Sequence, residues 1–194
     1  IEFNGKEDGI TAFMPALIKG YAQAGIKIVS TYPDNAKSGL PAVSATVLLT
    51  DPETGVVNAL LDGTELTRMR TGAVSGLATK LLANPDASAG AIFGTGGQAE
   101  AQLEAMLTAR NLSEVHIYDL SPERVAAYIK RVSAMAEKFG VKLIAAASSD
   151  AAADGADVIT TVTTSPQPVF AGHTGKEGAH INAVGTFMPH KRER

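Results

Sequence analysis

The feature that most constrains this 194-residue chain is a glycine-rich turn between a short apolar run and a helical pattern. The turn reads Gly94-Thr95-Gly96-Gly97-Gln98-Ala99, which is a G-x-G-x-x-A pattern. The first glycine permits a tight bend, the second lets a pyrophosphate approach the backbone, and the small third residue lets the helix pack on the strand. Free N–H groups and the helix dipole favour a phosphate there. We therefore expect all six residues to bind a dinucleotide, although an ordinary βα turn can share the pattern.

A carboxylate at the end of the next predicted strand supports this interpretation. Asp119 closes the strand predicted over 114–118. At that place a carboxylate accepts hydrogen bonds from the ribose hydroxyls of the adenosine. It would also repel a 2′-phosphate, so we expect NAD as the cofactor, with NADP as the alternative. Arg124 would weaken this preference if it folded over the ribose; otherwise it is an ordinary surface residue of the first helical turn.

Strand and helix patterns alternate from residue 65 to the end of the chain. This alternation predicts an α/β fold with a Rossmann-type doubly wound parallel sheet and helices on both faces. We assign residues 65–194 to an NAD(P)-binding Rossmann domain that is incomplete at its C-terminus. The predicted strands are 89–93, 114–118, 141–147, 157–162 and 180–184, and the predicted helices are 65–83, 97–110, 121–138 and 150–153.

The pattern before residue 65 is different, and we assign residues 1–64 to part of an α/β substrate and dimerisation domain. We expect a helix over 9–24, closed by Gly25, and a short strand over 26–31. Two further strands, 42–50 and 56–61, should pair as a hairpin around the turn at 51–55.

Composition excludes several classes of function. The net charge is −3, so nothing favours nucleic acid. There are no cysteines, which excludes disulfides, thiolate metal sites and cysteine nucleophiles and fits a cytoplasmic location. The four histidines show no ligand spacing, and we expect His180 to make a hydrogen bond at a strand end. No apolar run is long enough for a membrane span. We therefore expect no metal, no nucleic acid and no membrane partner.

Two motifs together resemble the ornithine cyclodeaminase/mu-crystallin family. They are Thr67-Arg68-Met69-Arg70-Thr71-Gly72-Ala73 and the glycine turn that follows it. The runs 25–29 and 178–185 fit the same family. The resemblance implies a homodimer of two-domain subunits, which transfer a hydride between NAD(P) and a small α-amino or α-imino acid. Family subunits are longer, so the chain resembles their middle.

Two cations are the candidate substrate-binding residues. A substrate carboxylate suits the planar fork of Arg70 and the point charge of Lys27. Lys27 lies within an apolar strand pattern, and the alternative is an edge strand with an outward lysine. For Arg70 the alternative is a solvated helix residue. The resemblance favours the functional roles and implies that Lys27 is also catalytic, because it can polarise or protonate the imine.

Four more residues are candidate cofactor ligands. The resemblance implies that the hydroxyl of Thr71 contacts the cofactor phosphates. Thr161, Val162 and Thr163 follow a predicted strand and so lie at the carboxyl end of a parallel sheet, where cofactors bind. Plain β propensity is the alternative explanation for these three residues.

One position departs from the family pattern. Cyclodeaminase members carry an aspartate where this chain has Phe187. A phenyl ring cannot act as an acid or base. We therefore expect an imine reductase or amino-acid dehydrogenase. The alternatives are an ornithine cyclodeaminase, which would need another base, and a non-catalytic nucleotide-binding module of the mu-crystallin type.

Overall fold

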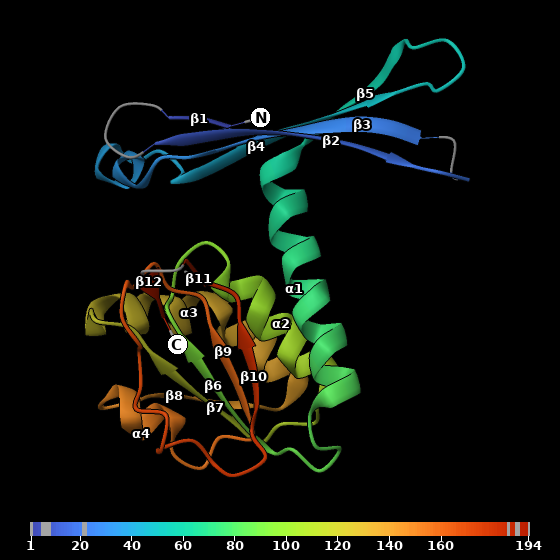
Figure 1. The fold of residues 1–194 in the computed structure, drawn as a ribbon. Coiled ribbons are helices and arrows are strands. Elements are labelled where there is room, and N and C mark those ends of the chain that lie inside the picture. Colours follow the sequence, from blue (N-terminus) through green and yellow to red (C-terminus); the bar gives the residue numbers. More distant parts are fainter. Residues whose placement is uncertain (1, 5–8, 21–22, 186, 189–190, 194) are drawn as a thin grey trace. The chain divides into compact units, whose positions relative to one another are not determined.

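The computed structural model divides the chain into two compact units, residues 1–69 and 70–194 (Figure 1). It describes residues 2–4, 9–20, 23–185, 187–188 and 191–193, with the backbone alone at 2–4, 36, 187–188 and 191–192. Helix α1 (Gly63–Leu82) contains the division between the units. The predicted boundary at residue 64 lies at the start of this helix and stays a prediction.

The first unit is an antiparallel sheet whose five described strands are neighbours in chain order. A short 3-10 helix, η1, separates its third and fourth strands. The predicted hairpin is confirmed: Asp51 Oδ1 accepts hydrogen bonds from the N–H groups of Glu53 and Thr54, and Gly55 has a φ of 72°. The elements are β1 (Glu2–Asn4), β2 (Ile10–Ile18), β3 (Gln23–Thr31), η1 (Pro33–Ser38), β4 (Val43–Thr50) and β5 (Val57–Asp62).

The predicted helix over 9–24 is wrong, because β2 and β3 form a hairpin there. Ala, Leu and Met favour a helix locally, but Pro15 would break its interior. The described part of β1 pairs only with residues 10–12, so Pro15 has a described partner strand on one side alone, where proline is tolerated. Gly25 closes no helix. It lies inside the sheet, where a Cβ would stand 2.7 Å from Leu48 O.

The second unit confirms the predicted Rossmann-type sheet. Its five parallel strands lie in the order β10-β9-β6-β7-β8, so the chain order reverses beside β6 (Figure 1). The elements are β6 (Ala89–Phe93), α2 (Ala99–Ala109), β7 (Glu114–Tyr118), α3 (Pro122–Phe139), β8 (Lys142–Ala145), α4 (Ser149–Ala153), β9 (Val158–Thr161), β10 (His180–Ala183), β11 (Phe187–Met188) and β12 (Lys191–Arg192).

Alternate side chains of β6 divide the core into two clusters, one on each face of the sheet. Ile92 packs in a cluster with residues of α2 and α3, including Leu103 and Tyr128. Phe93 packs in the other cluster, with Ala152 of α4 and Phe170, whose ring centroid is 5.0 Å from that of Phe93. Successive residues of a strand point to opposite faces. Helices therefore cover both faces, and the strand ends of the sheet are left to form a site.

Candidate functional site

The glycine turn leaves the carboxyl end of β6 through a bend that only glycine accommodates well. Gly94 has a φ of 95°, in the left-handed region, and its N–H donates to Tyr118 O over 2.8 Å. A Cβ at this position would lie 3.0 Å from Val162 O and 3.0 Å from Thr163 Cγ2. The segment that follows β9 thus approaches the turn closely, and the fold itself explains the first glycine of the motif.

The fold does not explain the next two glycines. A Cβ at Gly96 or Gly97 would meet nothing within 4 Å, and neither residue has a positive φ. Within the described part of the chain, neither N–H has a recorded acceptor. These groups lie just before the first residue of α2, where the helix dipole favours an anion. Open space and free donors together fit a pyrophosphate that approaches the backbone.

Asp119 anchors the turn from the end of β7. Its Oδ2 accepts hydrogen bonds from Thr95 N (3.0 Å) and Thr95 Oγ1 (2.8 Å), and its Oδ1 accepts one from Ser121 N (3.3 Å). Arg124 Nη2 lies 3.6 Å from Oδ2. Burial raises the pKa of Asp119, but the Thr95, Ser121 and Arg124 contacts outweigh it, so the pKa lies below the usual 3.8. The carboxylate is therefore ionised at neutral pH and keeps lone pairs for further donors.

These groups surround one cavity of about 660 Å³ at the carboxyl ends of β6, β7 and β9. Its walls are the turn at 94–96, the segment 118–120 with Arg124, and the segment 162–169, together with Phe93 and Ser149. The structure thus brings together Gly94, Thr95, Gly96, Asp119, Val162 and Thr163. The cavity lies where the strand order reverses, which is where open α/β sheets bind ligands.

Other predicted cofactor residues do not line this cavity. Gly97 and Gln98 lie in the turn before α2, and Ala99 is fully buried as the first residue of α2, with its carbonyl accepting from Tyr128. Thr161 is also fully buried. Thr71 lies in α1, where its carbonyl accepts a hydrogen bond from Ser75 Oγ (3.3 Å). Their proposed cofactor contacts stay predictions.

Sequence reasoning missed Glu193. Its side chain is 2% exposed and accepts hydrogen bonds from Thr161, Thr163 and Gly185. No sequence pattern indicates this role, since the residue lies in a charged run near the end of the chain. Thr164 and residues 166–169 of the cavity wall were also missed, because a coil segment has no periodicity to follow.

Lys27 occupies the middle of β3, and β3 is the central described strand of the first unit. It stands opposite Met14 of β2 and Val47 of β4. The alternative of an edge strand is therefore wrong. A half-buried ammonium on a central strand has less access to water than one at an edge. This position fits the proposed functional role of Lys27, which stays a prediction.

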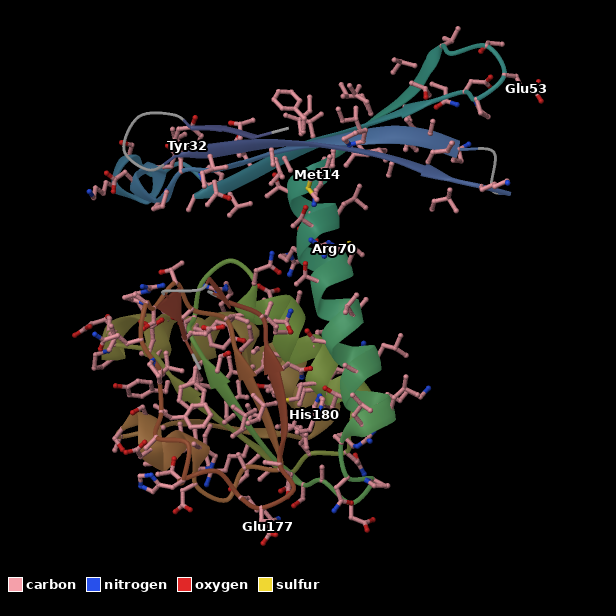
Figure 2. All side chains as sticks on the ribbon, in the orientation of Figure 1. Met14, Tyr32, Glu53, Arg70, Glu177 and His180 are labelled. Atoms are coloured by element: carbon pink, nitrogen blue, oxygen red, sulfur yellow. The ribbon has the colours of Figure 1, made fainter. Side chains whose placement is uncertain are left out.

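Arg70 stands exposed on α1, and Figure 2 labels it there. Its neighbour Arg68 is bound instead, with Nη2 2.5 Å from Glu65 Oε1. Among the carboxylates that the structure describes, none forms an ion pair with Arg70. An exposed guanidinium can bind an external carboxylate, and the substrate-binding role of Arg70 stays a prediction.

The described residues give no support to a metal site. No group of three or more His, Asp or Glu side chains gathers among them. His180 Nε2 instead lies 3.1 Å from Asn182 Oδ1, at the start of β10. In the described helices, no segment is both long and apolar enough to cross a membrane. Only the backbone of Phe187 is described, so the consequence of this residue stays a prediction.

Comparison with known proteins gives the chain a family. The model of the ornithine cyclodeaminase/mu-crystallin family matches residues 1–194. Delta(1)-pyrroline-2-carboxylate reductase of Bacillus cereus is 38% identical over 187 residues, which are 96% of this chain and 56% of the reductase. The chain thus spans a little over half the length of this curated relative.

Two solved structures have the same fold. Delta(1)-pyrroline-2-carboxylate reductase of Thermococcus litoralis, in complex with NADH and L-proline, has a TM-score of 0.87 and 37% identity over 93% of this chain and 55% of its own. A lysine cyclodeaminase, described for its recognition of L-lysine, L-ornithine and L-2,4-diaminobutyric acid, has a TM-score of 0.84 and 36% identity over 95% of this chain and 53% of its own.

Asp119 should set a preference for NAD over NADP. Replacing it by Ser removes the repulsion of a 2′-phosphate, worth roughly 1–2 kcal/mol at a partly exposed site, and should narrow the ratio of the two dissociation constants about tenfold. Because the folded-state pKa lies below 3.8, Asp119 stays ionised between about pH 5 and 8, so a change of the preference over that range should follow only the second ionisation of the 2′-phosphate, at about pH 6. Fluorescence titration with both reduced cofactors measures the ratio.

Glu123→Ser is the matched control, since Glu123 is an acidic residue of the same segment that does not line the cavity. It should leave the ratio unchanged. Tighter binding of NADP than of NAD by the unaltered chain would contradict the assignment.

Proposed function

Because this chain belongs to the ornithine cyclodeaminase/mu-crystallin family, we propose that it is an NAD-dependent oxidoreductase acting on a small α-imino acid or its amino acid. The observation that carries the proposal is one cavity formed by the glycine turn, Asp119 and the segment 162–169. The similarity to a reductase bound to NADH and L-proline supports the same class of reaction.

The chain's own groups account for cofactor binding. The N–H groups of Gly96 and Gly97 would hold the pyrophosphate, and the carboxylate of Asp119 would accept hydrogen bonds from the ribose hydroxyls. The side of the cavity formed by Val162 and Thr163 would flank the rest of the dinucleotide. Thr71, in the other family motif at 67–73, would contact the phosphates. NADH, when bound, supplies the hydride.

Arg70 and Lys27 would act on the substrate. The guanidinium fork of Arg70 suits a carboxylate, which it can bind through two parallel hydrogen bonds. The ammonium of Lys27 would bind the same substrate and donate a proton to the imine nitrogen, which becomes the amine nitrogen of the product. In the reverse direction, neutral Lys27 would accept that proton from the amine.

A second candidate function is cyclodeamination of a diamino acid. The 36% identity to a lysine cyclodeaminase favours it. Phe187 argues against it, because a phenyl ring stands where the cyclodeaminase pattern has an aspartate. We therefore rank reduction of an external imino acid first.

Turnover separates the enzymatic proposal from a nucleotide-binding module without activity. NADH is mixed with a cyclic imino acid that carries a carboxylate, and the loss of NADH absorbance is followed. Steady oxidation of NADH supports the oxidoreductase, whereas binding of NADH without oxidation supports the module. If NADH does not bind, both are wrong.

Arg70→Ala should weaken substrate binding while NADH binding stays nearly unchanged. Removing one partner of a charged, desolvated contact costs about 2–5 kcal/mol, which corresponds to a rise in KM for the imino acid of about 30-fold or more. Arg68→Ala is the matched control on the same helix, because Arg68 pairs with Glu65. A large loss of NADH affinity in folded Arg70→Ala would contradict a substrate role.

The chain should not convert ornithine to proline. Cyclodeamination needs a group that moves a proton at the substrate amine, and Phe187 supplies none. The assay incubates the chain with ornithine and a catalytic amount of NAD, without added reductant, and measures proline. Proline above the level of a protein-free control would contradict this assignment and favour the second candidate.

A homodimer is the proposed assembly. Apolar side chains remain exposed on the first unit, including Leu17 (72% exposed), Ile18 (58%) and Leu60 (69%). Leu17 and Ile18 are adjacent in β2 and so point to opposite faces of its sheet. Large apolar side chains exposed on both faces of a sheet favour association with a second surface.

Sedimentation velocity at micromolar concentration should therefore show a dimer. Leu17→Glu should shift the chain towards monomer, because a charge would be buried in the association surface. Leu120→Glu, the same change at a leucine of the second unit that is 91% exposed, should not. A monodisperse monomer of the unaltered chain, with a cooperative melt above about 60 °C, would contradict self-association.

A further inference from the structure

We propose that Glu193 is a positioning residue that holds the segment 163–169 in the shape of a cofactor-binding wall. The expected effect on NADH affinity rests on the proposed function. The structural content of the proposal, the fastening of this segment by one buried residue, can be tested without any cofactor. Glu193 itself does not line the cavity, so it would act through the residues that it binds.

The carboxylate of Glu193 binds the start of the segment with both of its oxygens engaged. Oε2 accepts hydrogen bonds from Thr163 N (2.8 Å) and Thr163 Oγ1 (2.7 Å). Oε1 accepts from Thr161 Oγ1 (2.9 Å) and Gly185 N (2.5 Å). Among the residues that the structure describes, no Lys, Arg or His forms an ion pair with Glu193. Four directed donors therefore stabilise the buried carboxylate in place of a cation.

The backbone of Glu193 binds the other end of the segment. Its carbonyl accepts a hydrogen bond from Val169 N over 2.9 Å. One residue therefore fixes both Thr163 and Val169, and these two lie at the ends of one cavity wall. Between them, Thr163 Oγ1 accepts from Ser165 N (3.1 Å), so the hydroxyl that donates to Glu193 also orders the first turn of the wall.

Gly185 shows how closely this arrangement is packed. A Cβ at this position would collide with the Glu193 carboxylate and with Thr163 O. The glycine therefore lets β10 end directly against the carboxylate and donate to it. The segments that end β9 and β10 are thus both linked to the charged residue that follows β12.

The wall depends on Glu193 because its own segment has no regular structure. Residues 162–179 form no helix or strand, so no ladder of backbone hydrogen bonds fixes their path. Losing the carboxylate would leave the N–H of Thr163 without its acceptor and free the segment to move. A wall that moves out of place loses its polar contacts with the cofactor, and this lowers NADH affinity.

The test compares two variants at Glu193 with a matched control. Glu193→Ala removes all the side-chain acceptors, and Glu193→Gln keeps one oxygen, so it should lose less. The control is Asp157→Asn. Asp157 is also a buried carboxylate (8% exposed), and it accepts from Ser88 N (2.9 Å) and Ala89 N (3.1 Å) and pairs with Lys176, which lies outside the wall at 163–169. Asp157 directly precedes β9, so it lies at the amino end of this strand, whereas the cavity lies at the carboxyl ends of the strands.

The first measurement is NADH affinity, at a temperature where circular dichroism shows every variant folded. Glu193→Ala should raise the dissociation constant about tenfold, the effect expected from losing one good hydrogen bond to the cofactor. Glu193→Gln should raise it less, and Asp157→Asn should leave it unchanged even where its melting temperature falls. Wild-type NADH affinity in folded Glu193→Ala would overturn the proposal. So would an equal loss of affinity in Asp157→Asn, since the effect would then follow stability alone.

The second measurement is amide hydrogen exchange without cofactor. In Glu193→Gln, and in Glu193→Ala where it folds, the amides of Thr163 and Val169 should exchange faster than in the wild type. Those of Ser88 and Ala89 should not change. Unchanged protection of Thr163 overturns the proposal. If the wild type binds no NADH, the proposed function fails, and this measurement still decides whether Glu193 holds the wall.

Discussion

The candidate site depends on the position of β6 at the centre of the parallel sheet. It forms hydrogen-bonded ladders with β7 on one side and β9 on the other. These ladders bring the carboxyl ends of the three strands together at one end of the sheet. The strand order reverses beside β6, so the connections that follow β6 and β9 leave in opposite directions and a cavity remains between them. The glycine turn, Asp119 and the segment 162–169 face each other for this reason.

Two carboxylates set the shape of this cavity from opposite sides. Asp119 fixes the glycine turn through Thr95, and Glu193 fixes the opposite wall through Thr163. Both carboxylates accept hydrogen bonds mainly from N–H and hydroxyl groups. Each carboxylate thereby orders the turn or segment to which those donors belong. Their proposed roles differ, because Asp119 lines the cavity and can still accept a ligand hydroxyl, while Glu193 lies behind it.

The second unit was predictable from sequence because its signals are local. Ser121 caps α3 by accepting from Arg124 N, with Pro122 as the first helical residue, and Gly140 ends the helix with a φ of 66°. For residues 9–24 the local signals predicted the wrong structure, a helix in place of two paired strands. Their Ala and Leu content favours a helix, but the register from Ile10↔Thr31 to Ile18↔Gln23 supplies partners that no local pattern reveals.

The sequence by itself determined the glycine turn, the carboxylate after the next strand and the family motif around Arg70, because each depends on residues close together in the chain. Tertiary structure alone decided that Lys27 stands on a central strand, since strand order arises from pairing with distant segments. It also decided that Glu193 binds Thr163, which precedes it by 30 residues. Such a contact requires the folded path of the chain, and no spacing in the sequence encodes it.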